Sequence, residues 1–349
     1  MEQKYILTLL LVLFCGMFSI GLISVFANEN AEKPQERAVM AEKYVPDVTK
    51  MCLNGEVNVA EKLTSAEPPI TEAEKDLQNV QNVEVNTTSP TNVGEISTNF
   101  TLSNDYLEKL EKTAGSYGCQ AAFYYENLAT GQVISRNENV KFTSASTIKA
   151  PYIKSLLAEN VNLDEQIPLS KTAANRGAGV GLKPVGTLFS VRDLMSAAII
   201  DSDNSAYWLL GEHFGYEAYN RSAAEVGVRT RTSPVDKYVS YSAKEQAALF
   251  KDIYNFSQAD KNGAWLVEKM ANASYSEQIS AALPERKVAH KFGEIQGIVY
   301  HDCAIVFAEN PYVLVILTDI NSAREDRNAI FIELSQQIDE INENLRNNA

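Results

Sequence analysis

The chain has 349 residues, 45% of them hydrophobic, and a formal net charge of −14 at pH 7. Such an acidic chain repels polyanions, which excludes nucleic acid as a partner and argues against anionic lipid surfaces. The three histidines are too scattered to predict a metal site: His213, His290 and His301. We therefore expect neither a metal nor another cofactor.

The first segment of the chain is hydrophobic, and residues 5–26 carry no charged side chain. This run is longer than the core of most signal peptides and long enough for one membrane-spanning helix, whereas Ala27 suits a cleavage site. We predict residues 1–27 to be a signal peptide or an N-terminal membrane anchor. The rest of the chain would then be extracytoplasmic, either secreted or anchored to the cell membrane.

Residues 28–100 are rich in Glu, Asn, Thr and Val, hold five of the eleven prolines and show no sustained periodicity. That composition predicts a disordered acidic stalk. Apolar residues at helical spacing first appear at 105–113, so we place the folded domain at 101–349.

Three cysteines lie outside the hydrophobic run: Cys52, Cys119 and Cys303. In an oxidising compartment they allow at most one intramolecular disulfide. Cys119 and Cys303 each lie in an apolar, strand-like context, and we interpret them as small buried side chains.

Two strand-like runs, 119–125 and 132–136, follow the first helix and are joined by a loop typical of a hairpin. The pattern then turns helical, and Ser190 and Ser242 each begin a helix-opening box with an acidic residue three positions later.

Three more strands are expected at 288–292, 298–307 and 312–318, before a closing helix at 324–346. Because strands lie at both ends and helices between them, the sequence predicts an α+β fold. The two ends would build one sheet, with a helical lobe inserted between them.

Three short patterns fall in one order along the chain: Ser146-Thr147-Ile148-Lys149, Ser202-Asp203-Asn204 and Lys291-Phe292-Gly293. Each is weak alone, since such short patterns also arise by composition. Their order is informative, because a serine nucleophile, a lysine base, a proton-relaying serine and a second lysine are the parts of one acyl-transfer site.

Ser146 would need a base, because an alcohol of ordinary pKa is a poor nucleophile. A helix places residues three apart on one face, so Lys149 is the candidate base. If Ser146 opens the helix that runs to Leu157, its backbone N–H points toward the reacting carbonyl. The plainer interpretation is a serine N-cap followed by a solvated lysine.

The second and third motifs have plain interpretations too. Ser202 would pass a proton to the leaving nitrogen while Asn204 holds Lys149 or the substrate amide, but this motif also suits an N-cap box at a helix junction. Lys291 would aim its charge from a strand end toward a substrate carboxylate, with Gly293 allowing close backbone approach. Taken alone, Lys291 would be a strand-end lysine in water.

Over residues 101–349 the chain resembles the class A β-lactamase-like serine hydrolases, the penicillin-recognising acyl-enzyme family. The motifs carry this resemblance, together with the stretches around them at 124–149, 186–204, 289–302 and 312–318. It implies a five-stranded antiparallel sheet flanked by helices, an inserted all-helical lobe, and a site in the cleft between them.

The resemblance also implies a role for each motif residue. Three would do the chemistry: Ser146 as the acylated nucleophile, Lys149 as its base and Ser202 as the proton relay. Four would bind the substrate: Asn204, Lys291, Gly293 and Glu294. The backbone N–H groups of Ser146 and Glu294 would form the oxyanion hole. The substrate would be a β-lactam or a peptidoglycan stem peptide, and the protein a monomer.

Two features depart from the family pattern. Phe292 stands where the third motif normally has a hydroxyl residue that binds the β-lactam carboxylate. Efficient members also carry a glutamate, with an asparagine four residues later, on a loop after the second motif, and we expect no such loop glutamate between Asn204 and Lys291. The nearest carboxylate there, Asp236, we interpret as a surface residue. Without a water-activating base, an acyl-enzyme should form faster than it breaks down.

The sequence therefore predicts an exported serine hydrolase that is acylated at Ser146 by a β-lactam or a D-alanyl cell-wall amide, with slow β-lactam turnover. Two alternatives stay open. One is a membrane-anchored D,D-peptidase or penicillin-binding protein. The other is a catalytically idle member that binds a cell-wall fragment or a protein.

Overall fold

The computed structural model describes residues 94–176 and 179–347. They belong to the second of two compact units, which spans residues 86–349. The predicted signal or anchor at 1–27 and most of the predicted stalk at 28–100 lie outside the described residues. Within the described part, no helix is both long and apolar enough to cross a membrane.

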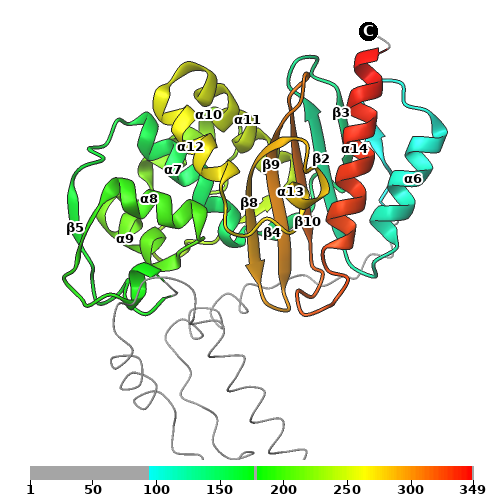
Figure 1. Ribbon diagram of the computed structural model, residues 1–349. Coiled ribbons are helices and arrows are strands. Elements are labelled where there is room, and N and C mark those ends of the chain that lie inside the picture. The colour runs from blue at the N-terminus through cyan, green and yellow to red at the C-terminus, as the bar shows by residue number, and fades with distance from the viewer. Residues whose placement is uncertain (1–93, 177–178, 348–349) are drawn as a thin grey trace, which may run out of the picture. The chain divides into compact units, whose positions relative to one another are not determined.

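An antiparallel sheet of six strands organises the unit (Figure 1). In spatial order its strands are β1 (Ser97–Thr98), β3 (Val133–Arg136), β2 (Ala121–Asn127), β10 (Tyr312–Thr318), β9 (Val299–Phe307) and β8 (Lys287–Ile295).

Five of these strands match the predicted ones, and the two-residue strand β1 is an addition. It pairs Ser97 with Ser135 and Thr98 with Ile134. It lies before residue 101, so the sheet begins earlier than the predicted domain boundary. A two-residue strand held by main-chain bonds has no apolar pattern from which it could be predicted.

Side chains of the central strands alternate between two cores. On β2, Phe123 and Tyr125 pack into one core, whereas Ala122 and Tyr124 pack into the other. Because helices cover both faces of the sheet, its central strands are apolar at almost every position. This explains the continuous apolar run at 312–318.

Three helices cover one face of the sheet: α6 (Asn104–Gly115), α13 (Ile279–Ala282) and α14 (Ala329–Asn347). The last of them lays Ile330, Leu334, Ile338 and Ile341 on the sheet at helical spacing. It begins at Ala329 rather than at residue 324, since Arg324 is held in the preceding turn by Asp326 and by the carbonyl of Tyr117.

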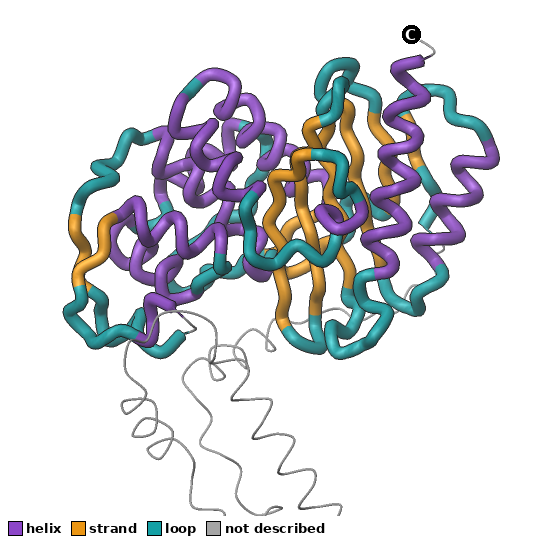
Figure 2. The backbone as a smooth tube through the Cα atoms, viewed as in Figure 1, coloured by secondary structure: helices purple, strands orange, loops and turns teal. Residues whose placement is uncertain are grey.

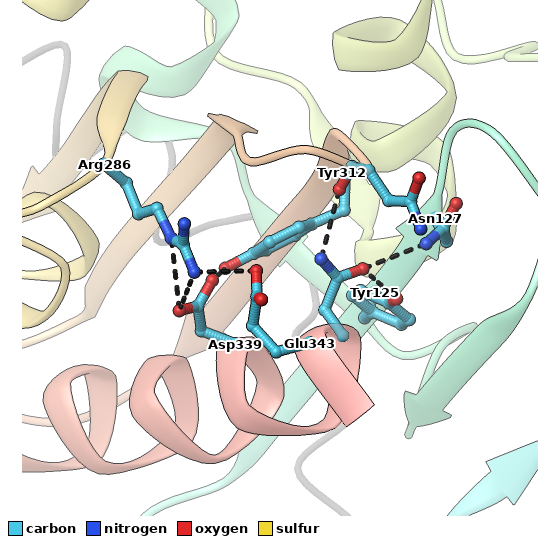
Figure 3. A network of polar contacts seen from close by, with 8 residues as sticks. Tyr125, Asn127, Arg286, Tyr312, Asp339 and Glu343 are labelled. Carbon is cyan, nitrogen blue, oxygen red and sulfur yellow. Dashed lines mark hydrogen bonds and ion pairs between the residues drawn. The ribbon is translucent and has the colours of Figure 1, made fainter. Parts of the chain in front are cut away.

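A partly buried polar network fastens α14 to the sheet (Figure 3). Arg286 Nη2 lies 3.1 Å from Asp339 Oδ2 and 2.8 Å from Glu343 Oε1. Tyr312 OH donates to Asp339 Oδ1 at 2.9 Å. The guanidinium of Arg286 thus contacts two carboxylates, and the neutral hydroxyl of Tyr312 adds a hydrogen bond to one of them.

Asn342 continues the network one turn later along α14. Its Oδ1 accepts from Tyr125 OH at 2.7 Å and from Asn127 Nδ2 at 2.9 Å. Its Nδ2 donates to Asn310 O at 3.1 Å. Every polar atom of this buried amide therefore has a partner, as a stable buried network requires.

The inserted lobe lies between β3 and β8 in the sequence and beside the sheet in space (Figure 2). Its helices are α7 (Lys149–Ala158), α8 (Val191–Ile200), α9 (Asn204–Phe214), α10 (Glu217–Glu225), α11 (Ala243–Ala259) and α12 (Lys261–Ala271).

Both predicted helix starts in this lobe are confirmed. Ser190 Oγ accepts from Asp193 N at 3.0 Å, and Ser242 forms a complete capping box with Glu245. The lobe is not purely helical, because it also holds a ladder of β5 (Gln166–Pro168) with β6 (Leu188–Ser190).

Cys303 is buried and Cys119 is half-buried, and both are free thiols. Burial raises the pKa of the Cys119 thiol to about 11. The interpretation of both as small packing residues fits this placement, while Cys52 lies outside the described residues.

Candidate active site

Ser146 lies on a short 3₁₀ turn, η1 (Ala145–Ile148), that leads directly into α7. Its side chain is partly exposed, although its neighbours on the turn are buried. The helix expected to open at Ser146 therefore becomes α-helical only at Lys149. This places Pro151 in the first α-helical turn, where its missing N–H breaks no hydrogen bond.

The backbone around the site is strained at two residues. Ala145 has a φ of +44° and Ser202 a φ of +55°, in the left-handed region that residues other than glycine avoid. Thr147 Oγ1 holds the turn by donating to Ser144 O at 2.6 Å, and it accepts from Gln246 Nε2 at 2.9 Å. Strain fixed by surrounding bonds is typical of functional sites.

Lys149 is completely buried, and its amine meets three oxygen acceptors of the second motif. Its Nζ lies 2.5 Å from Ser202 O, 3.3 Å from Ser202 Oγ and 2.6 Å from Asn204 Oδ1. Burial, aided by the charge of Lys291, holds the pKa of Lys149 well below its ordinary value. A neutral amine in this position can act as a base.

Lys291 reaches the same serine from β8. Its Nζ donates to Ser202 Oγ and to Phe292 O, both at 2.9 Å, and the side chain is 1% exposed. Burial lowers the pKa of Lys291 to about 7. The plain interpretations of Lys149 and Lys291 as lysines in water are therefore wrong.

The second motif lies at the predicted helix junction, between α8 and α9. Asp203 caps α9 through a bond from Ala206 N to its Oδ1 at 2.9 Å, so the N-cap interpretation is correct for this residue. Ser202 and Asn204 turn toward the lysines instead. Tyr238 OH also donates to Asn204 Oδ1 at 3.4 Å, a contact that the sequence did not predict.

Gly293 lets β8 approach the turn that carries Ser146. A Cβ at this position would lie 3.0 Å from Thr147 Cγ2 and 3.1 Å from both Ser144 O and Ser146 N. The predicted close backbone approach is present, and a side chain would disturb it. Glu294 follows at the exposed end of this outermost strand.

The loop between α10 and β7 (Ser240–Ser242) supplies no glutamate. Asp236 is the single acidic residue between positions 227 and 242, and it is exposed. An E-x-x-x-N does occur later, from Glu268 to Asn272. It lies at the end of α12, where Glu268 pairs with Lys287 rather than with the site.

This loop instead brings a cation close to the second motif. Lys237 Nζ lies 2.9 Å and Arg176 Cζ 3.4 Å from the ring centroid of Trp208, one helical turn after Asn204. Two cations therefore contact one indole ring. Nothing in the sequence pattern indicated it, because the residues come from three separate segments.

Two observations complete the geometry. Among residues 94–176 and 179–347, the hydroxyl of Ser146 makes no hydrogen bond, and Lys149 is bound to Ser202 and Asn204 instead. Within the same ranges, no three His, Cys, Asp or Glu side chains are grouped so as to hold a metal ion.

Together, the antiparallel sheet, the inserted helical lobe and the three motifs that meet between them define the α+β fold of β-lactamases and transpeptidases. The sequence profile of the β-lactamase enzyme family matches residues 105–341, more than half of the chain. The chain belongs to this family, and the resemblance to its class A members is confirmed.

Relatives and solved structures agree with this assignment. β-Lactamase 3 of Bacillus cereus is 26% identical over 242 residues, which cover 64% of this chain and 75% of that protein. β-Lactamase 1 of the same organism is 25% identical over 255 residues, covering 68% and 81%.

Two structures illustrate the shared fold. PBP-A matches with a TM-score of 0.62 and 19% identity, over 70% of this chain and 97% of that one. An ancestral class A β-lactamase matches with a TM-score of 0.60 and 23% identity, over 68% and 99%. The predicted fold class is thereby confirmed.

Proposed function

We propose that this protein is an exported serine hydrolase that forms an acyl-enzyme on Ser146 with a β-lactam or a D-alanyl cell-wall amide. One observation carries the proposal. The buried amines of Lys149 and Lys291 meet at Ser202, beside the strained turn that presents Ser146. Membership of a serine hydrolase family supports the same chemistry.

Acylation begins when Ser146 Oγ attacks the carbonyl carbon of the amide and the neutral amine of Lys149 takes its proton. The backbone N–H groups of Ser146 and Glu294 stabilise the oxyanion. As the C–N bond breaks, Ser202 Oγ gives its proton to the leaving nitrogen and regains one from Lys149. The product is an ester on Ser146 and a free amine.

Deacylation is the slow step in this proposal. Hydrolysis of the ester needs a base to activate water, and the loop between α10 and β7 offers only the exposed carboxylate of Asp236. The acyl-enzyme should therefore accumulate. A solved acyl-enzyme complex of a PBP-A point mutant with penicillin G has a TM-score of 0.62 to this chain, which supports a β-lactam as an acyl donor.

Two other functions have specific support. The loop without a glutamate favours a membrane-anchored D,D-peptidase or penicillin-binding protein, in which a penicillin adduct persists. Phe292, in place of a hydroxyl residue, favours an idle member that binds a cell-wall fragment or a protein. Export rests on the hydrophobic run at residues 5–26, and protease accessibility on intact cells tests it.

Intact-protein mass spectrometry tests the proposal. The protein is incubated with penicillin G and with active-ester probes, alongside Ser146→Ala and, as a matched control, Ser116→Ala on the surface. We expect an adduct that persists for minutes in the parent protein and the control, and none in Ser146→Ala.

Three results would count against this reading. Failure of every probe to form a Ser146-dependent adduct would refute the acyl-enzyme. Rapid nitrocefin turnover would refute slow deacylation and the penicillin-binding alternative. Full retention of all measurable activity in Ser146→Ala would favour the binding role.

A further inference from the structure

A cavity of about 260 Å³ lies next to the third motif. Because side chains alternate along a strand, Phe292 and Glu294 line this cavity while Lys291 and Gly293 face the site. The cavity is smaller than a typical pocket for a whole drug-sized ligand. Its volume suits one substituent of a ligand rather than a whole drug-sized molecule.

One wall of the cavity is aromatic. The rings of Phe292 and Tyr275 have centroids 4.7 Å apart and planes inclined by 43°. Phe292 offers no hydrogen bond to a carboxylate, whereas the faces of aromatic rings attract cations. Lys291 already illustrates this attraction, since its Nζ lies 4.4 Å from the centroid of Phe292.

The polar lining has an excess of negative charge. It contains two exposed carboxylates, Glu277 and Glu294. The one cation among the described lining residues, Arg327, pairs with Glu277 at 3.1 Å. One carboxylate therefore remains without a balancing charge in the lining, so a substrate carboxylate would be repelled there.

A buried amide points to the same class of ligand. Gln278 lines the cavity, is 1% exposed, and its Oε1 has no hydrogen-bond partner. A buried acceptor without a partner is unfavourable until a donor reaches it. A hydrogen-bond donor of a ligand, such as an ammonium N–H, would satisfy it once the amide turns its oxygen toward the cavity.

We propose that this cavity is a subsite for a primary ammonium group, carried on a short aliphatic or aromatic chain by the acyl donor. The inference rests on the proposed function, because the subsite would serve substrates of Ser146. It assigns a substrate class opposite in charge to the carboxylate that Lys291 was expected to anchor.

Binding is measured apart from catalysis in the full chain carrying Ser146→Ala. Benzylamine and benzoate, which have similar shapes and opposite charges, are titrated by ligand-observed NMR. We expect benzylamine to bind at least about tenfold more tightly than benzoate. Benzoate binding as tightly as benzylamine would overturn the proposal.

Two substitutions test whether the preference for benzylamine over benzoate arises in the cavity. Glu294→Gln should weaken benzylamine several-fold, because it removes the unbalanced carboxylate. Glu277→Gln should strengthen benzoate, because it releases Arg327 from its ion pair. Glu285→Gln, an exposed position outside the cavity lining, is the matched control. Effects of equal size in the control would show that the net charge of the protein, rather than the cavity, sets the preference.

Acylation then separates this proposal from the proposed function. Two phenyl esters with the same acyl group, one with a 4-aminomethyl and one with a 4-carboxymethyl substituent on the phenolate leaving group, are compared by the rate of adduct formation on Ser146. We expect the amine donor to react at least about tenfold faster. A faster carboxylate donor would refute the subsite and keep the acyl-enzyme. Bound benzylamine with no adduct from either donor would refute the acyl-enzyme and keep the subsite.

Discussion

The partly exposed charges under α14 and the buried cluster around Ser202 are arranged in opposite ways. Under α14, Arg286 meets the carboxylates of Asp339 and Glu343. At Ser202, two lysines approach one hydroxyl group, and burial lowers the pKa of both. Matched charges serve stability, whereas like charges held together supply a neutral amine at some loss of stability.

Lys149→Met tests the cluster around Ser202 and should have the largest effect on the acylation rate. Loss of the base lowers the acylation rate by about 100- to 10,000-fold. The free energy of unfolding stays within about 1 kcal/mol, since relief of the buried like charges offsets the lost hydrogen bonds. Adduct formation and urea unfolding measure the two quantities. Lys244→Met, which is exposed, should change neither, and an unaltered rate in Lys149→Met would refute the assigned base.

Gly293→Ala tests the close approach of β8 to the nucleophile turn. The added Cβ would meet backbone atoms of Ser144 and Ser146 at 3.1 Å, so the turn must shift. We expect acylation to fall by about 10- to 100-fold, because small misplacements of reacting groups are costly. Gly115→Ala is the control, since its Cβ meets nothing within 4 Å. Equal rates in both variants would contradict the prediction.

Asp339→Ala tests whether the network under α14 stabilises the fold. It removes the carboxylate that Arg286 and Tyr312 share, although Arg286 keeps its pair with Glu343. We expect the free energy of unfolding to fall by about 1–3 kcal/mol. The acylation rate of the folded protein should not change. Urea unfolding measures the loss, with Glu159→Ala as control, because its exposed pair with Arg221 contributes at most about 1 kcal/mol. A slower acylation in Asp339→Ala would show that the two networks are coupled.

Lys291→Met tests how the charge of Lys291 changes the pH dependence of the acylation rate. Acylation requires neutral Lys149, so the rate falls as the pH drops below the pKa of Lys149. After burial, the charge of Lys291 is the second cause that lowers this pKa. Removing that charge raises the pKa of Lys149, and the acidic limb of the rate profile should move to higher pH.

The difference between the two rate profiles should be confined to the pH range in which Lys291 is charged. Lys291 is charged below its own pKa of about 7, so variant and parent profiles should differ most below that pH and converge above it. Adduct formation is followed from about pH 5 to about pH 9. The exposed Lys109→Met serves as control, and an acidic limb that stays in place or moves to lower pH would contradict the expected coupling.

Features with a local signal could be predicted from the sequence. The apolar runs indicated five strands of the sheet, and the box at Ser242 indicated the start of α11. The order of the motifs identified Lys149, Ser202 and Lys291, which the structure brings together. In each case the relevant pattern lies within a few neighbouring residues or within the family motif.

Features that depend on distant contacts could not be predicted. Gln246 binds Thr147 across 99 positions of the chain, and although Thr147 lies in the first motif, no pattern in the sequence indicates Gln246 as its partner. The left-handed backbone conformation at Ala145 could not be predicted either, because no glycine stands at this position. Lys149 and Lys291 were each compatible with a solvated lysine, because their burial is decided by helices packed from elsewhere in the sequence.

The strained residues Ala145 and Ser202 limit how this site could be transplanted. An engineer who copied only the side chains of the motifs onto another scaffold would obtain relaxed turns at both positions. The hydroxyl and carbonyl of Ser202 would then diverge from Lys149, which both of them contact here. A working graft would have to import the surrounding framework that forces these two peptides into their unusual shape.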